Sequence, residues 1–133
     1  MIVLVLAGKA GNNGKGKSMR FECEIYELLR PFRLKGKNIG LFDLIEAVAL
    51  VTEEPGRIHA VQKEVYMVIA AERRCSWMAI ESSIRRALEQ AWKHNRRYMD
   101  ELTGYALDSC PTAAEFVYIC AATIIKKHMG TMK

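Results

Sequence analysis

The chain has 133 residues, half of them hydrophobic, which is enough for one domain with a buried core. No apolar run is long enough to span a bilayer, and the longest, residues 1–7, is too short for a signal peptide, so we expect a cytoplasmic protein without a membrane partner. The net charge of +5 is concentrated in two segments. Residues 1–37 hold 8 Lys/Arg and 3 Glu, and residues 62–97 hold 8 Lys/Arg and 4 Glu. Clustered positive charge suits a polyanion such as nucleic acid, although a basic surface also keeps a protein soluble.

The cysteines and histidines lack the spacing of a metal site. No Cys-x-x-Cys pair occurs, and the histidines are scattered. We therefore expect no cofactor and interpret the cysteines as reduced thiols, mostly in the core. The residues concerned are Cys23, Cys75, Cys110, Cys120, His59, His94 and His128.

The N-terminal segment differs from the rest of the chain. Residues 1–7 form a short apolar strand or a buried tail, and Gly8–Ser18 forms a loop or a disordered stretch. Gly11–Ser18 also fits the phosphate-binding loop pattern, Gly-x4-Gly-Lys-Ser. Because no parallel strands are predicted to support such a site, a basic or disordered arm is favoured over nucleotide binding. We therefore divide the chain into an arm, residues 1–20, and a helical domain, residues 21–133.

From Phe21 onward, apolar residues recur at helical spacing, which predicts an all-α fold. The first helix ends before Pro31, and Pro55 and Gly56 end the second. Gly104 ends a short helix before the last one begins near Pro111. The predicted helices span Phe21–Leu29, Leu41–Ala49, Ile58–Ala71, Trp77–Lys93, Asn95–Thr103 and Pro111–His128, and the third of them directs Val61, Val65, Val68 and Ile69 inward.

The helix Trp77–Lys93 has the clearest pattern. Ser76 is a good N-cap for it, and its apolar residues form one stripe at 100° per residue. The core face holds Ile80, Ile84, Ala87, Leu88 and Ala91, with Trp92 at its edge, and the opposite face holds Met78, Ala79, Ser82, Arg86, Glu89 and Lys93.

Two amphipathic helices joined by a short turn, over about residues 62–93, form the pattern of a helix-turn-helix. In that motif the second helix enters the major groove of DNA, and arginines and lysines around it neutralise phosphates. A plain helical bundle without a DNA-binding role gives the same pattern, so both interpretations remain open. The candidate DNA-binding residues are Arg73, Arg74, Ser76, Trp77, Met78, Ala79, Glu81, Ser82, Arg85, Arg86, Lys93, Arg96 and Arg97.

Several of these residues also have structural interpretations. Trp77 either stacks on a base or thymine methyl group or packs in the core. Glu81 either accepts a hydrogen bond from cytosine or pairs with Arg85 one helical turn away. No nucleophile, base and orienting group come together at any recognisable spacing, so we expect neither an enzyme nor a small-molecule substrate.

A set of short motifs is spread over the residues from about Leu34 to Lys127. They are Leu34-Lys35-Gly36, Lys63, Tyr66, Ile69-Ala70, Ile80-Glu81, Ile84-Arg85, Ala87-Leu88-Glu89, Ala91-Trp92, Gly104-Tyr105, Pro111-Thr112 and Glu115-Phe116. In these motifs the chain resembles a known family, the C-terminal DNA-binding effector domain of the sporulation master response regulator (stage 0 sporulation protein A). The resemblance implies an all-helical fold with a helix-turn-helix, sequence-specific binding of duplex DNA, transcriptional control and a homodimer on tandem sites.

The chain departs from the family at the start of the second helix. The resemblance implies DNA contacts by two arginines and a glutamate; the glutamate is retained as Glu81, but the arginine positions fall on Ala79 and Ser82. Alanine and serine cannot make the bidentate contact of arginine with guanine, so we expect a different DNA site. The family's regulators also carry an N-terminal receiver domain, for which this chain leaves no room, so we expect regulation without aspartyl phosphorylation. A protein-interaction module that modulates a related regulator is the alternative.

Overall fold

The computed structural model describes residues 19–34 and 39–131, and every regular element in these ranges is helical. The all-α prediction is thereby confirmed for the described part of the chain. The predicted strand or arm at residues 1–18, with its Gly11–Ser18 loop, lies outside it. The α-helices are α2 (Met19–Leu29), α3 (Ile39–Glu53), α4 (Met67–Arg73), α5 (Trp77–His94), α6 (Arg96–Thr103) and α7 (Ala113–Thr131), with two 3₁₀ helices, η1 (Arg30–Phe32) and η2 (Pro55–Ala60), and a π-helical turn, η3 (Gln62–Tyr66).

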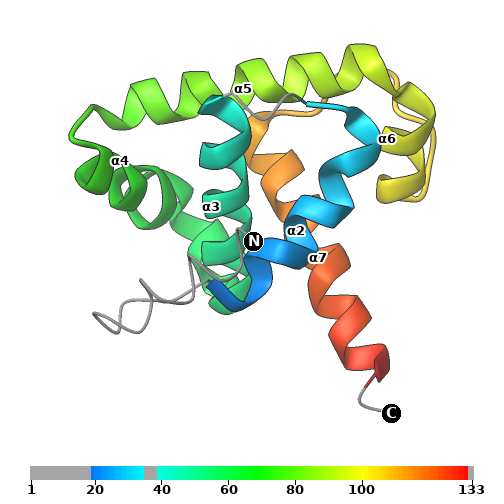
Figure 1. Ribbon diagram of the computed structural model, residues 1–133, viewed down its shortest axis with the longest axis horizontal. Coiled ribbons are helices and arrows are strands. Elements are labelled where there is room, and N and C mark those ends of the chain that lie inside the picture. The colour runs from blue at the N-terminus through cyan, green and yellow to red at the C-terminus, as the bar shows by residue number, and fades with distance from the viewer. Residues whose placement is uncertain (1–18, 35–38, 132–133) are drawn as a thin grey trace.

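Helix α3 forms the centre of the core. Apolar side chains are buried on all of its sides from Leu41 to Val51, as is typical of a helix enclosed by other helices. It contacts α2, α5 and α7, and Figure 1 shows α5 lying across the bundle with α3 beneath it. Since α3 holds α5 from below, the position of α5 is set by the core of the whole domain.

The segment η1 closes the bundle beneath the C-terminal end of α5. As expected from Pro31, α2 ends at Leu29 and the chain turns into η1. Phe32 is fully buried there and makes edge-on ring contacts with Tyr98 and Phe116, at centroid distances of 4.9 and 5.9 Å. Aromatic pairs in this geometry add to the stabilisation that burial alone provides.

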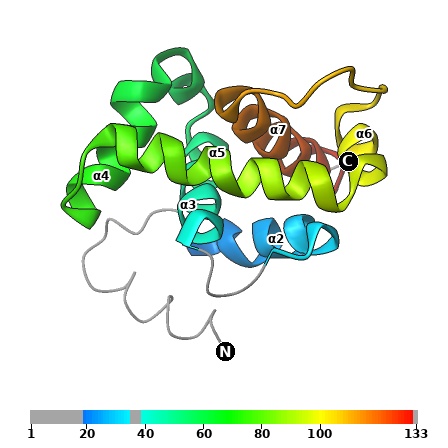
Figure 2. The ribbon, with the colours of Figure 1, turned by 90° about the horizontal axis from the view of Figure 1, so that it is seen from above.

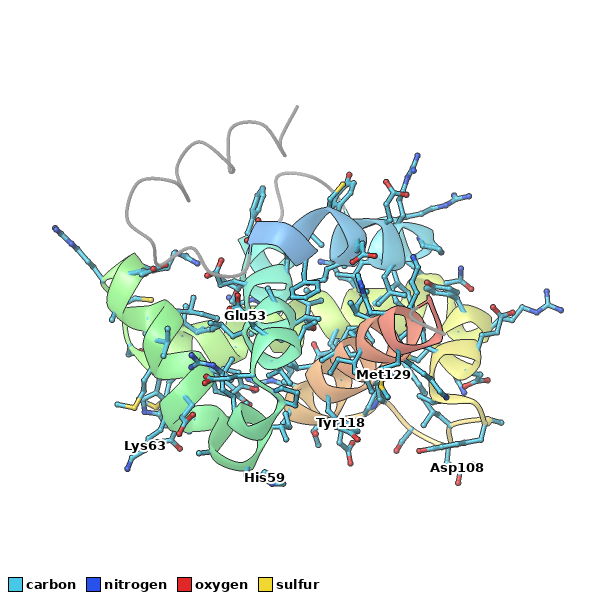
Figure 3. The ribbon with its side chains drawn as sticks, turned by 90° about the horizontal axis from the view of Figure 1, so that it is seen from below. Glu53, His59, Lys63, Asp108, Tyr118 and Met129 are labelled. Atoms are coloured by element: carbon cyan, nitrogen blue, oxygen red, sulfur yellow. The ribbon has the colours of Figure 1, made fainter. Side chains whose placement is uncertain are left out.

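The predicted helix from Ile58 to Ala71 is helical throughout, but it is not one regular α-helix. The chain instead forms η2, then the π-helical turn η3, then α4, which begins only at Met67. Val68, predicted to face inward, is 38% exposed. The buried residues are Val65, Tyr66, Ile69 and Ala70. If each residue turns the helix by 100°, the middle of this buried stripe lies about 130° around the helix axis from Val68. Tyr66 thus takes the inward place that the sequence pattern gave to Val68. His59 and Lys63 point outward from this segment (Figure 3).

The prediction that most cysteines lie in the core was also wrong. All four cysteines are free, but only Cys120 is buried, and Cys23 and Cys75 are exposed. Cys23 lies on the outer side of α2, and Cys75 lies in the turn before α5, where no element covers it. Burial raises the pKa of Cys120, so this thiol stays protonated in the core.

Candidate nucleic-acid interface

A three-residue turn, Arg74 to Ser76, joins α4 to α5. Arg74 takes the left-handed conformation with φ of 56°, and its backbone N–H donates to the carbonyl of Ala70. The N–H of Cys75 donates to the same carbonyl at 3.0 Å. Ser76 then caps α5 as predicted, because its Oγ accepts a hydrogen bond from the N–H of Ala79 at 3.2 Å. Helix, short turn and helix therefore follow one another as the sequence indicated.

Helix α5 buries one face and presents the other to solvent. The predicted core residues are buried, and Trp92 is partly buried against them. Ser83 is buried as well, although the sequence pattern did not place it in the core. Seen from above, α5 runs over the bundle from α4 to α6, with α2 and α7 on either side (Figure 2). The exposed residues of its outer face are Met78, Ala79, Arg85, Arg86, Glu89 and Lys93, whereas Ser82 is half-buried.

Arg73 holds the C-terminal end of α4 against α3. Its guanidinium donates a hydrogen bond to the carboxylate of Asp43, whose side chain is only 3% exposed. That hydrogen bond raises the pKa of Arg73, so the guanidinium stays charged. Arg73 was predicted as a phosphate ligand; Nη1 of its guanidinium is hydrogen-bonded to Asp43, while 38% of the side chain is exposed. The sequence gives only a weak signal for this pair, because Asp43 and Glu46 are both acids in the otherwise apolar segment from Leu41 to Val51 and nothing local distinguishes them.

Glu81, Ser82 and Arg85 form a small network on the surface of α5. Arg85 donates from Nη1 to Glu81 Oε1 at 2.8 Å and from Nη2 to Ser82 Oγ at 3.4 Å. The predicted pair between Glu81 and Arg85 is thus confirmed. Burial, with a smaller contribution from the nearby Glu81 carboxylate, raises the pKa of Tyr66 to about 12. This tyrosine therefore packs beneath α5 as a neutral side chain.

Arg74 and Arg86 are the cations most available around the turn. Both are exposed, and neither forms an ion pair with another residue in the described ranges. Arg74 lies in the turn itself, and Arg86 lies on the outer face of α5. Unpaired guanidinium groups of this kind bind phosphate readily.

The remaining predicted cations lie at the other end of α5, which is about 27 Å long at 1.5 Å per residue. Lys93 and Arg97 are exposed there. Arg96 lies 3.9 Å from the centre of the Trp92 ring and donates to the carbonyl of Leu107 at 3.1 Å. The structure therefore does not bring Lys93, Arg96 and Arg97 together with the residues around the turn.

Trp77 is partly buried and packs against the core, which supports its structural interpretation.

Among the described residues, no group of three or more histidine, cysteine or acidic side chains is arranged to hold a metal ion. In that same part of the chain, no helix has both the length and the apolar character needed to cross a bilayer.

An all-helical bundle in which a short turn and a capped, outward-facing helix follow a bracing helix defines a helix-turn-helix domain. Residues 25–124, about three quarters of the chain, match the family model described as sporulation initiation factor Spo0A C terminal. The chain belongs to this family, which comprises non-enzymatic DNA-binding effector domains of sporulation transcription factors. The resemblance seen in the sequence is confirmed.

Proposed function

We propose that this protein is a sequence-specific regulator of transcription that binds duplex DNA with the N-terminal half of α5 in the major groove. The observation that carries the proposal is the outer face of α5, which is largely exposed, begins at a capped turn that carries Arg74, and includes Arg86, both arginines being unpaired within the described ranges. Recognition helices dock in this way, with their first residues against the base edges.

The candidate residues divide into roles. Arg74 and Arg86 bind phosphates, and Arg85 joins them when its bond to Glu81 opens. Met78, Ala79, Glu81 and Ser82 face the bases. Arg73 stabilises the domain through Asp43, and Arg96 does so through Trp92. Ser76 caps α5 and Trp77 packs against the core beneath it. Lys93 and Arg97 contact the DNA backbone that flanks the site.

The remaining parts of the proposal concern the whole chain. The DNA-binding domain covers residues 21–133, and the lysines of residues 1–20 add phosphate contacts. The protein acts in the cytoplasm, pairs as a homodimer on tandem sites and has no small-molecule substrate. Support comes from the family to which the chain belongs and from the basic composition of the arm.

Selection of random duplex DNA by the purified protein, at low and at near-physiological salt, tests the proposal. We expect one enriched motif, lost in an Arg85→Ala/Arg86→Ala variant. A Lys93→Ala/Arg97→Ala variant removes the same charge from the other end of α5 and is expected to keep the motif. Salt-sensitive retention without enrichment would contradict sequence-specific binding, because phosphate contacts alone carry no sequence information.

A protein-interaction module is the second candidate function. A groove of about 800 Å³ runs between α7 and the loop that precedes it, and exposed Tyr105 and Tyr118 line it. Tyrosine is enriched at protein interfaces. Failure to retain any DNA in the selection, together with binding to a full-length regulator of the same family, would favour this function.

A further inference from the structure

We propose that the first turn of α5 recognises the 5-methyl groups of thymines, so that the protein selects T-containing sites through apolar contacts by Met78 and Ala79. The inference rests on the proposed function, since it concerns how the same helix reads DNA. It names the chemical class of the site, thymine-bearing base pairs in the major groove.

The first observation is an apolar surface where a base-reading surface is expected. Met78 is 56% exposed and Ala79 is exposed, although both lie in the first turn of a helix whose core face is well packed. Neither residue is part of the buried face of α5. A long apolar side chain exposed at the entry of a recognition helix gains stabilisation only when a partner covers it.

The second observation is that the polar groups around these residues are already engaged. The Oγ of Ser76 accepts the capping bond from Ala79 at 3.2 Å. Glu81 and Ser82 both receive hydrogen bonds from Arg85, at 2.8 and 3.4 Å. Arg85 thus holds Glu81 and Ser82 against the surface of α5, and the groups that the first turn itself presents to a partner are the Met78 side chain and the Ala79 methyl group.

Charge complementarity identifies DNA as the occupant of this surface. Arg74 lies in the turn, next to the start of the helix, and Arg86 lies two turns further along the outer face. Both are exposed, so each is able to hold a phosphate on one side of the apolar turn. An apolar centre between two cationic groups matches a major groove, where methyl groups lie between phosphate backbones.

Thymine is the base whose major-groove edge fits such a surface. Its 5-methyl group is the apolar feature among the base edges, and cytosine carries an amino donor beside a bare C5 position. Guanine recognition, which relies on bidentate arginine, is not available to Met78 or Ala79. Removing one methyl group from an apolar contact weakens binding by about fourfold.

The test uses the tightest duplex obtained by selection, with each thymine replaced in turn by deoxyuridine. This exchange removes the methyl group and leaves base pairing intact. We expect about fourfold weaker binding at one or two positions for the unmodified protein, and no such loss for a Met78→Ala variant. The control is Met129→Ala, a similarly exposed methionine on α7, 61% exposed (Figure 3), which is expected to retain full sensitivity to deoxyuridine.

Three outcomes separate the inference from the function on which it rests. Specific binding that is insensitive to deoxyuridine at every position overturns the thymine inference and leaves the proposed function intact. The contact by Met78 is overturned if Met78→Ala binds specifically and remains as sensitive as the unmodified protein. Absence of binding to any duplex overturns both. Since alanine favours helix and the site is exposed, the variant is expected to fold normally.

Discussion

The two ends of α5 carry similar numbers of cations and use them differently. At the C-terminal end, Arg96 stacks on Trp92 and donates to the carbonyl of Leu107. His94 Nδ1 lies 2.9 Å from the carbonyl oxygen of Phe32. Asn95 donates to the carbonyl of Pro31 at 3.1 Å. This end is a structural junction. At the N-terminal end, one arginine is committed to Asp43, while Arg74 and Arg86 remain exposed.

The comparison shows that positive charge alone does not identify a nucleic-acid interface. Both ends of α5 contribute equally to the basic excess of residues 62–97. What separates them is whether each guanidinium already has an acceptor inside the protein. An arginine that binds a buried carboxylate or a backbone carbonyl has fewer free donors and a less mobile guanidinium, which makes it a poorer phosphate ligand than an unpaired arginine.

Replacement of Arg73 by alanine is expected to have the largest effect. The buried carboxylate of Asp43 loses its partner, and since Arg73 is itself 38% exposed, we expect a loss of about 2.5 kcal/mol, below the range for fully buried pairs. Urea unfolding of Arg73→Ala measures this loss. Arg86→Ala is the matched control and is expected to change stability by less than about 0.5 kcal/mol. Equal stability of the two variants would show that the link between α3 and α4 is unimportant.

Stability is expected to fall by about 2 kcal/mol between pH 10 and pH 12 because of Tyr66. An unfolded tyrosine loses its proton near pH 10, whereas the pKa of Tyr66 in the folded protein is raised to about 12. The folded state therefore binds more protons in this window, and rising pH favours unfolding. Comparison of unfolding curves with those of Tyr66→Phe isolates the contribution. A phenylalanine variant with the same pH dependence as the unmodified protein would rule it out.

At the C-terminal end, Arg96→Ala is expected to destabilise the protein by about 1.5 kcal/mol, through loss of the contact with Trp92 and of the bond to Leu107. Arg97→Ala removes the same charge from an adjacent exposed position and is expected to change stability by less than about 0.5 kcal/mol. Thermal unfolding of the pair measures the difference. A larger effect at Arg97 would reverse our assignment of the two arginines.

The smallest expected effect is a gain in folding stability from a substitution in the turn between α4 and α5. Arg74 holds a φ of 56°, which glycine adopts without strain, so Arg74→Gly is expected to stabilise the protein by about 0.5 kcal/mol. The same change removes an exposed guanidinium, and the salt slope of DNA binding is expected to decrease by about one. Chemical unfolding and a salt titration measure the two effects. An unchanged salt slope would remove Arg74 from the DNA interface.

Much of this architecture follows from local sequence. The spacing of apolar residues defines the core face of α5, Ser76 marks its start, and the separation of Glu81 from Arg85 predicts their pair. These features depend on residues within one or two helical turns. The roles of Arg73 and Arg96 were not predictable, because their acceptors belong to α3 and to the loop before α7. Only the packed structure brings these groups together.

The division of α5 into a buried and an outward face has an evolutionary consequence. Substitutions at Met78, Ala79 or Arg86 leave the packing of Ile80, Ile84 and Leu88 untouched, since these side chains point to opposite sides of the helix. A lineage is therefore free to exchange the exposed residues of α5 while retaining the scaffold. Under the proposed function, duplicated copies of such a gene would acquire new DNA sites through a few codon changes, without passing through an unfolded intermediate.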